Sequence, residues 1–310
     1  MLFLNRCSLI FVISTLCQIP FVLIAKESVS ENGKILSCQV AGGLGNQLFQ
    51  IANALAMAWD YGYEPIFPMI SYAESRVAPR PVYWDSIFHK IQTYTCEESY
   101  LDLVPCYEES CLYYKKIYPS EDRVKLIGYF PSHRYFDHHR EKIWAMFELP
   151  PEWDAIVEER FREIKINEAD VTVSIHIRLD DTFLEPVHGV IDFWRKPYDS
   201  YYDQAISLFP ADVILVIFSD NCAWSREYMK DKLQGRRAVY VCDQDFLDIN
   251  LMARCDHNII VNSTYSWWGA YLNQNPDKIV VAPKYWQARG NHPFRPDIHM
   301  PNWTLIDNCY

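Results

Sequence analysis

Residues 171–181 have the sequence VTVSIHIRLDD, and this stretch indicates the fold class of the chain. Apolar side chains occupy alternate positions, at Val171, Val173, Ile175 and Ile177. This period of two is typical of a β-strand. The carboxyl end of the strand carries four polar or charged residues: His176, Arg178, Asp180 and Asp181. Ligands of open α/β sheets bind beyond the carboxyl ends of the strands, so we expect a binding crevice here.

Arg178 is the candidate for binding an anion in this crevice. Its guanidinium group stays charged and can form two parallel hydrogen bonds with a phosphate. The alternative is an ordinary ion pair at the end of the strand, with Asp180 or Asp181 as the partner. This stretch alone leaves both interpretations open.

Strand and helix patterns alternate through the C-terminal half of the chain. Strand patterns occur at residues 171–177, 212–218, 237–242, 258–261 and 278–282. Helical patterns occur at residues 198–208, 222–233, 246–255 and 264–274. Such alternation predicts a parallel sheet with helices on both of its faces.

Two further strand ends point at the same crevice as Arg178. One is followed by residues 219–220, Ser-Asp, and the other by residues 262–266, Asn-Ser-Thr-Tyr-Ser. Asn, Ser and Thr are favoured N-caps, so the helix that begins near Thr264 would direct free N–H groups towards a diphosphate opposite the arginine. Asp248 begins the helix just upstream. It could accept both N–H groups of a guanine edge, or it could simply complement the helix dipole.

A glycine-rich turn lies near the start of the N-terminal half. A strand pattern begins at Ile35, the sequence GGLGNQ follows, and a helical pattern then runs from Leu48 to Trp59. Three glycines of this turn would let the backbone approach a ligand: Gly42, Gly43 and Gly45. A dinucleotide fingerprint fails because the third glycine and the acid after the second strand are missing. A P-loop is excluded because no Gly-Lys-Ser/Thr follows.

The composition indicates a globular protein with room for two domains. Half of the 310 residues are hydrophobic and 15% are aromatic. The net charge of −11 argues against a nucleic-acid-binding protein, which would need a basic face. Residues 69–165 hold many aromatic side chains without a clear period, which suits either sugar stacking or an ordinary core.

An apolar leader precedes these patterns. Residues 7–25 contain no charged residue and just reach the length of a membrane-spanning helix. We expect a retained type II anchor, and a signal peptide cleaved after Ala25 is the alternative. In either case the body of the protein would lie in the lumen or outside the cell.

Cysteine usage agrees with that location. Two of the ten cysteines belong to the leader, and the even number of the others predicts disulfides in an oxidising compartment. Their spacing does not suggest a zinc site. Sequons begin at Asn262 and Asn302, and we expect a glycan at Asn302. Asp243-x-Asp245 imitates a metal-binding D-x-D motif, but its position before a helix favours a structural role.

Four sequence blocks resemble the signature of the α-1,2-fucosyltransferases of glycosyltransferase family 11. They occur in the family's order within residues 41–284: GGLGNQLFQIANALA, SIHIRLDD, FSDN and HNIIVNSTYSWWGAYL. The resemblance implies an α/β fold of the GT-B type, in which two Rossmann-like domains face each other across a cleft. Residues 35–168 would form the mainly acceptor-side domain, and residues 169–310 the domain that binds GDP-fucose. Residues 1–25 would be the anchor and residues 26–34 a short stem.

The resemblance also implies an inverting transfer of L-fucose from GDP-fucose to the 2-hydroxyl of a galactose or similar residue of a glycan. No metal or other cofactor would be required, and the enzyme would lie in the Golgi membrane. Asp181 is the candidate base, with Glu185 as the alternative. Two other functions stay open: a non-catalytic lumenal protein that binds sugars or sugar nucleotides, and a fucosyltransferase with a different acceptor.

Individual residues match the family's motifs. His176 and Arg178 match its H-x-R motif and are, with Asp181, the candidate catalytic residues; the motif places the arginine on the β-phosphate. The other matches on the donor side are Gly43, Gly45, Asn46, Asp248, Ser263, Thr264, Tyr265 and Ser266. The family usually has Arg and Gly where this chain has Leu179 and Asp180, and this departure fits the non-catalytic alternative.

Overall fold

The structure is a computed structural model that describes residues 33–75, 78–98, 101, 103–108, 113–178, 199–233, 235–286 and 296–308. The predicted anchor lies outside these ranges. Within them, no helix combines the length and the apolar character needed to cross a bilayer.

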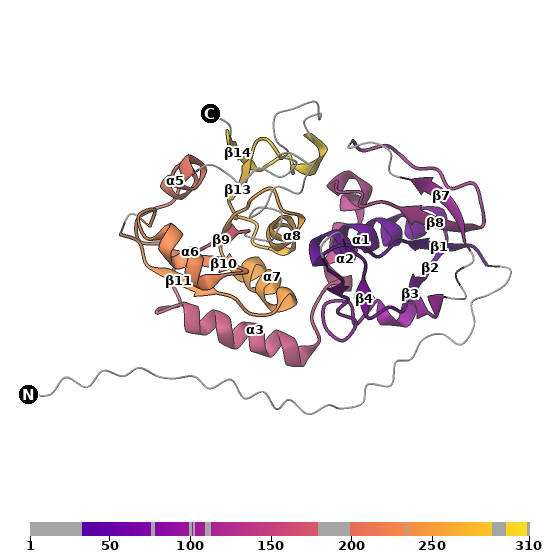
Figure 1. The fold of residues 1–310 in the computed structure, drawn as a ribbon, viewed down its shortest axis with the longest axis horizontal. Coiled ribbons are helices and arrows are strands. Elements are labelled where there is room, and N and C mark those ends of the chain that lie inside the picture. Colours follow the sequence, from indigo (N-terminus) through magenta and orange to yellow (C-terminus); the bar gives the residue numbers. More distant parts are fainter. Residues whose placement is uncertain are drawn as a thin grey trace, which may run out of the picture.

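The N-terminal half is built on a four-stranded parallel sheet with the order β2-β1-β8-β7. Its strands are β1 (Ile35–Cys38), β2 (Glu64–Pro65), β7 (Val104–Glu108) and β8 (Arg123–Ile127). Helix α1 (Leu44–Tyr61) follows β1 and lies against it (Figure 1). The helix ends at Gly62, whose φ of 70° lets its N–H donate to the carbonyl oxygen of Ala58.

Short elements complete this half of the molecule. β3 (Phe67–Pro68) pairs in parallel with β6 (Thr95–Cys96), and β4 (Tyr72–Ala73) pairs antiparallel with β5 (Arg80–Pro81). The 3-10 helices here are η1 (Gln92–Tyr94), η3 (His133–Tyr135) and η4 (Asp137–His139). Helices α2 (Arg140–Met146) and α3 (Pro151–Ile164) then lead to the second sheet. The sequence patterns did not predict α3, which packs against α7 beside the second sheet (Figure 1).

The C-terminal half contains a six-stranded parallel sheet with the order β11-β10-β9-β12-β13-β14. Its strands are β9 (Thr172–Ile177), β10 (Ile214–Ser219), β11 (Ala238–Val241), β12 (His257–Ile259), β13 (Val280–Pro283) and β14 (Thr304–Ile306). Numbered from β9, this is the 3-2-1-4-5-6 order of a doubly wound dinucleotide-binding domain. The strand order therefore reverses between β9 and β12, which is where such folds bind their ligand.

The helices between these strands are α5 (Asp199–Ser207), α6 (Cys222–Met229), α7 (Asp245–Arg254) and α8 (Thr264–Leu272). η5 (Pro296–Ile298) precedes β14. Each predicted strand and helix of this half is confirmed to within a few residues at its ends. β14 was not predicted, because three residues are too few for a period to show. A disulfide joins Cys222 to Cys242, so one disulfide of the predicted kind is present.

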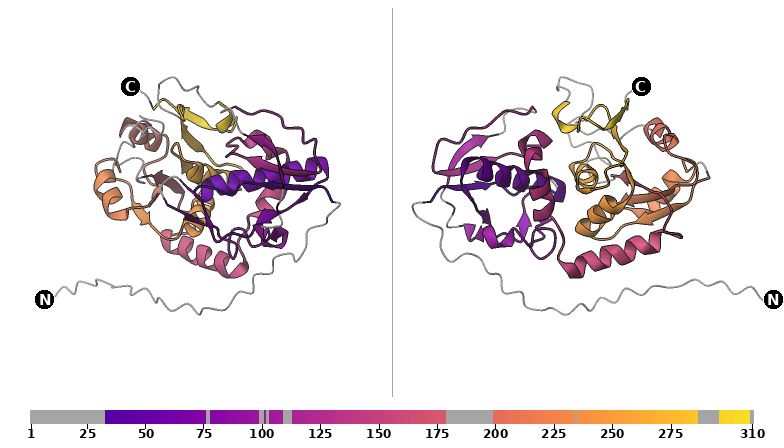
Figure 2. Two further views of the ribbon diagram at one scale, coloured as in Figure 1. Left: turned by 45° about the vertical axis from the view of Figure 1, so that its right-hand side comes forward. Right: turned by 180° about the vertical axis from the view of Figure 1, so that it is seen from behind.

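Aromatic side chains fill the place where the two halves meet. Helices α1 and α8 lie side by side between the two sheets (Figure 2). The ring of Phe49 lies 4.6 Å from that of Trp267 and 5.2 Å from that of Trp268. Phe136 stacks on Trp268 at 5.3 Å, and both tryptophans are 0% exposed. The adjacent tryptophans Trp267 and Trp268 therefore belong to the core rather than to a binding surface.

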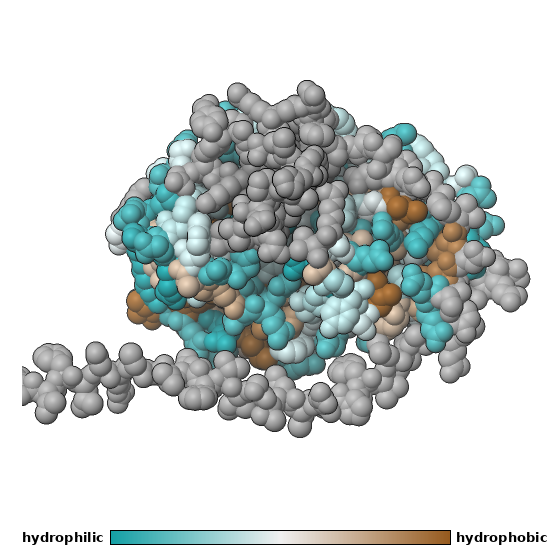
Figure 3. Space-filling view, viewed as in Figure 1, coloured by the Kyte–Doolittle hydropathy of each residue, from teal (hydrophilic) through white to brown (hydrophobic). Residues whose placement is uncertain are grey.

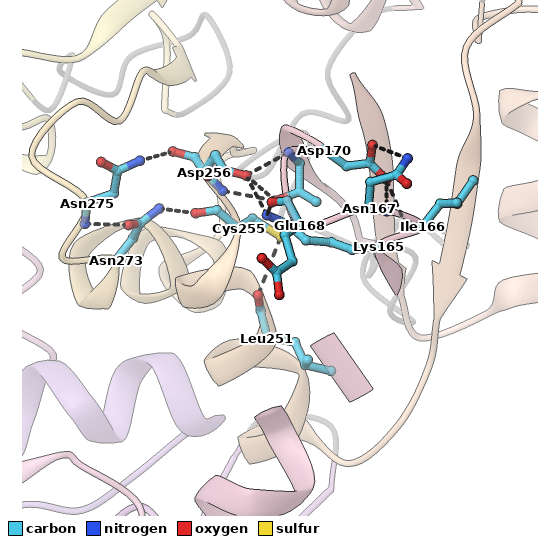
Figure 4. A network of polar contacts seen from close by, with 11 residues as sticks. Lys165, Ile166, Asn167, Glu168, Asp170, Leu251, Cys255, Asp256, Asn273 and Asn275 are labelled. Carbon is cyan, nitrogen blue, oxygen red and sulfur yellow. Dashed lines mark hydrogen bonds and ion pairs between the residues drawn. The ribbon is translucent and has the colours of Figure 1, made fainter. Parts of the chain in front are cut away.

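The amino ends of the second sheet hold a different set of polar residues (Figure 4). Asp256 accepts hydrogen bonds from both the backbone nitrogen and the hydroxyl of Thr172, each at 2.8 Å. Asn275 donates to the backbone oxygen of Asp256, and Asp170 accepts from the backbone nitrogens of the turn before β9. These donors lower the pKa of Asp170. This network holds strand β9 in register and lies at the edge opposite the predicted crevice.

Candidate functional site

The switch point of the second sheet brings two of the predicted segments together. β9 and β12 are parallel neighbours, with Ile175 opposite Ile259. Arg178 and Asn262 each follow three residues later, so both segments leave the same carboxyl edge. Arg178 is half-buried there. Residues 180 and 181, its alternative ion-pair partners, lie outside the described residues, so its phosphate role stays a prediction.

The first turns of α1 and α8 cross directly beside this edge. The Thr264 hydroxyl lies 2.9 Å from Oδ1 of Asn46, to which it donates. A Cβ on Gly45 would stand 2.4 Å from the backbone nitrogen of Tyr265 and 2.5 Å from the carbonyl carbon of Thr264. Only a glycine allows so close a crossing. The predicted contact between Gly45 and the donor is untested. The close approach of the two helices is a second reason for a glycine at this position.

Both crossing helices present an uncompensated N-terminus. Neither α1 nor α8 has an acidic residue in its first turn or a side chain that caps it. At the other end of α8, the Lys278 ammonium group donates to the backbone oxygens of Ala270 and Asn273. Burial lowers the pKa of Lys278 to about 8. The negative end of the α8 dipole is thus balanced while the positive end is not, which favours an anion at the crossing.

Two glutamines hold the glycine turn in place. Gln47 donates from Nε2 to the backbone oxygens of Gly42 and Pro81, at 2.9 and 3.1 Å. Gln50 accepts from the backbone nitrogen of Ala41 and donates to the oxygen of Gly128, both at 2.9 Å. Gly42 has a φ of 77°, which a residue with a Cβ adopts only under strain. These buried glutamines were not predicted, although their spacing on one face of the helix was visible in the sequence.

The side chain of His176 is buried beside the candidate site and does not line it. Its side chain is 7% exposed, and its ring lies 5.3 Å from the ring of Tyr265. Its backbone oxygen accepts from the hydroxyl of Tyr202 at 3.2 Å. The predicted catalytic role of His176 is untested, and this geometry suits positioning of Tyr265 more than contact with a substrate.

The remaining residues of the loop after β12 are mostly buried. Ser263 and Ser266 are 2% and 1% exposed, and the Ser266 hydroxyl bonds to the backbone of Val261 and Ser263. Asn262 is 1% exposed, whereas Asn302 lies exposed in a turn. Thr264 and Tyr265 are therefore the members of this loop best placed to meet a ligand. Glycosylation of Asn302 stays a prediction.

Tyr265 connects the loop to the start of α7. Its hydroxyl donates to the backbone oxygen of Asp245 at 2.6 Å. Tyr83, from the other half of the chain, hydrogen-bonds to the Asp245 side chain and packs on Phe246, with ring centroids 5.1 Å apart. Tyr83 was not among the named site residues, although it lies in the aromatic stretch for which sugar stacking was one interpretation. Nothing in the local sequence marks its contact with a residue so far along the chain.

Asp248 is buried at the start of α7. It is 6% exposed, and its two carboxyl oxygens lie 3.2 and 3.3 Å from the backbone nitrogen of Asp243. Burial raises the pKa of Asp248 to about 8. A carboxyl group in this position can accept hydrogen bonds once ionised, so both the guanine interpretation and the structural one remain consistent with the geometry.

The two aspartates of the D-x-D motif, Asp243 and Asp245, contact different residues. Asp243 lies 4.0 Å from the guanidinium of Arg160 on α3, whereas Asp245 contacts Tyr83. Burial raises the pKa of Asp245. This arrangement accords with the structural role predicted for the pair. The candidate bases Asp181 and Glu185 lie outside the described residues.

Comparison with known proteins identifies a family. The profile described as Glycosyl transferase family 11 matches residues 11–307. The O-antigen biosynthesis glycosyltransferase WbnK of Escherichia coli is 32% identical over 58% of this chain, and the match spans 60% of that relative's length. The α-1,2-colitosyltransferase of Escherichia coli is 26% identical over 82% of this chain and 93% of its own.

A mammalian relative and a solved structure extend this comparison. The galactoside α-(1,2)-fucosyltransferase 2 of Pongo pygmaeus is 25% identical over 82% of this chain and 74% of its own. The crystal structure of POFUT1 in complex with GDP-fucose has a TM-score of 0.51 at 13% identity, covering 81% of this chain and 98% of that one. This structural likeness supports the α/β, GT-B-like fold that was predicted.

One prediction from the sequence is wrong. A Golgi membrane location was expected, but two of the relatives come from Escherichia coli, a bacterium, which has no Golgi apparatus. The expectation rested on the apolar leader and on the Golgi anchor that is usual for animal members of the family.

Proposed function

The chain belongs to glycosyl transferase family 11, and on this basis we propose that it transfers L-fucose from GDP-fucose to the 2-hydroxyl of a galactose or similar residue in a glycan, with inversion. The names of its relatives support the α-1,2 linkage and the galactoside acceptor. The observation that carries the proposal is the crossing of two uncompensated helix N-termini beside Arg178, at the switch point of a doubly wound sheet.

The proposed chemistry follows from the leaving group. As the bond between the sugar carbon C1 and the phosphate oxygen breaks, negative charge grows on GDP and positive charge grows on the sugar ring. Arg178 and the N-termini of α1 and α8 would stabilise that negative charge, each charge-assisted hydrogen bond contributing about 1.5–3 kcal/mol. We propose that the reaction needs no metal, because these groups supply the positive charge.

The acceptor hydroxyl would attack C1 from the face opposite the leaving group, which inverts the configuration. A base that takes the proton of this hydroxyl would assist the attack. Asp181 is the proposed base, and Glu185 is the alternative. The buried His176 would act through Tyr265, by fixing the position of the ring that lies over it.

One face of the molecule is mainly polar where described residues form it. Where described residues form the surface in Figure 3, hydrophilic side chains predominate and hydrophobic ones lie in small separate groups. A glycan presents mainly hydroxyl groups, so a face of this kind can bind it through hydrogen bonds.

The test is an incubation of the purified protein with GDP-fucose and lactose, in which released GDP is measured. We expect release that depends on lactose, and a product whose fucose is α-1,2-linked to galactose when its linkage is determined by NMR. A colitosyl donor belongs in the same assay because one relative is named for that sugar. Donor binding without acceptor-dependent release would favour the non-catalytic alternative, and release with another acceptor would change the proposed substrate.

A further inference from the structure

Three potential metal ligands meet at the far end of α1. Asp60 lies in the last turn of α1, and His138 and His139 lie in η4. Nε2 of His139 is 2.8 Å from Oδ1 of Asp60, and Nε2 of His138 is 2.9 Å from Oδ2 of Asp60. One ligand atom of each side chain lies within 4.8 Å of the other two.

The orientation of the two histidines is unusual for neighbours in sequence. Side chains at adjacent positions normally point in different directions, but the turn of η4 directs both Nε2 atoms at one carboxylate. The ring of His139 is held edge-on against Trp59 with centroids 5.2 Å apart, and its side chain is 22% exposed. The two imidazole rings lie 4.5 Å apart. The three ligands are thus arranged before any ion binds, which reduces the entropy lost on binding.

We propose that Asp60, His138 and His139 form a binding site for a divalent transition-metal ion of the Zn²⁺ class. Two imidazoles and one carboxylate are ligands that suit zinc, cobalt, nickel or copper, whereas magnesium and calcium prefer oxygen ligands alone. Ligand atoms about 2.0–2.2 Å from a tetrahedral ion lie roughly 3.3–3.6 Å apart. The hydrogen-bonded atoms, now 2.8 and 2.9 Å apart, therefore need to separate by about 0.4–0.8 Å. Each Nε2 would give its lone pair to the ion: a neutral ring would then carry its single proton on Nδ1, and a charged ring would release its Nε2 proton to solvent.

A polar cavity leaves room for the rest of the coordination sphere. Asp60 and His138 line a cavity of about 460 Å³, together with Asn53, Lys116 and residues of η3. Asn53 is 1% exposed, and neither its amide nitrogen nor its amide oxygen has a hydrogen-bond partner among the described residues. A buried polar group without a partner is costly, so an occupant of this cavity that bonds to Asn53 is favoured. A hydroxylated ligand long enough to reach from the ion to Asn53 would meet that requirement.

This site is separate from the proposed donor site. Asp60 follows Asn46 by fourteen positions on the same helix, which places it roughly 21 Å farther along the axis. A metal bound here does not contact the groups proposed to bind GDP-fucose. The inference stands on its own geometry and does not depend on the proposed reaction.

The test is a titration of the full, EDTA-treated chain with ZnCl₂ by isothermal calorimetry, with Co²⁺ absorption as a probe of the ligand geometry. We expect wild type to bind one Zn²⁺ that the double variant H138Q/H139Q binds at least 100-fold more weakly. The matched control is H89Q/H257Q, which removes two imidazoles elsewhere: His89 contacts the Ser86 oxygen and His257 the Ile279 nitrogen. The control should bind like wild type.

Zn²⁺ should also raise the Tm of wild type and of the control, because an ion that binds only the folded chain stabilises the folded state. It should leave the Tm of H138Q/H139Q unchanged. If the double variant does not fold, Asp60→Asn supplies the same comparison, since the amide keeps the shape and loses the charge. Equal Zn²⁺ affinity in wild type and in either variant would overturn the proposal, and so would an equal loss in the control.

Discussion

Gly45 of α1 and Tyr265 of α8 touch through their backbones, so that a Cβ at Gly45 would stand 2.4 Å from the Tyr265 nitrogen. The contact joins the helix that follows the first strand of one sheet to the helix at the switch point of the other. The geometry of the candidate donor site depends on this crossing.

Gly45→Ala should therefore force the two helix ends apart. We expect a loss of about 1–3 kcal/mol in the free energy of unfolding, as for other overpacked sites, together with weaker GDP binding. For stability, Gly43→Ala is the matched control, because nothing lies within 4 Å of its Cβ position and its φ is −72°. Urea unfolding of both variants and GDP titration of Gly45→Ala check this. Equal losses of stability in the two variants would contradict a role for the crossing.

Arg178→Ala should depress kcat/KM by at least about two orders of magnitude. The contact it removes is charge-assisted and strengthens as the leaving group departs. Arg178→Lys should recover little, because a point charge replaces the two-pronged guanidinium. Steady-state kinetics with GDP-fucose and lactose provides the measurement. Near-normal turnover of Arg178→Ala would remove the phosphate assignment.

Transfer activity should survive an excess of EDTA. The proposed cleft supplies positive charge from Arg178 and two helix ends, and the side chains of Asp243 and Asp245 contact different partners. Chelation would empty the site proposed at Asp60 without stopping turnover. The assay compares rates before and after chelation. Activity that disappears and returns with Mn²⁺ or Mg²⁺ would instead identify the D-x-D carboxylates as ligands.

Asp248→Asn tests guanine recognition. If the carboxylate accepts two N–H groups of guanine, the amide places a donor against a donor, which costs about 1–3 kcal/mol. The affinity for GDP should then fall roughly ten- to a hundredfold. The affinity for IDP, which lacks the exocyclic amine, should fall less. Calorimetric titration of both nucleotides decides the matter, and small equal changes would leave Asp248 with a structural role alone.

The pH dependence of stability gives a second test of Asp248. Its pKa is raised by burial from 3.8 to about 8, so between these values the folded chain binds more protons than the unfolded chain. The contribution of this residue to stability must fall as the pH rises through that window. Between pH 5 and pH 8.5, wild type should lose at least about 1 kcal/mol more than Asp248→Asn in urea unfolding. Parallel losses would show that the residue ionises normally.

Local sequence patterns determined much of the second sheet. Strands β9 to β13 and helices α5 to α8 were predicted because side chains alternate with a period of two in strands and 3.6 in helices, and burial selects apolar residues at those positions. The position of Arg178 at a strand end followed from the same pattern. The Gly62 C-cap could also be predicted, since a left-handed residue ends a helix locally.

Contacts between distant residues were decided only by the tertiary structure. The strand order around β9 places strands side by side that are not consecutive in the sequence. Gly45 contacts Tyr265, and Asp60 contacts His138 and His139, although these partners are 78 or more positions apart. Periodicity encodes the local path of the backbone and which face is buried, but not which buried faces meet. The raised pKa of Asp248 is of the same kind, because its burial depends on the packing of α7 against its neighbours.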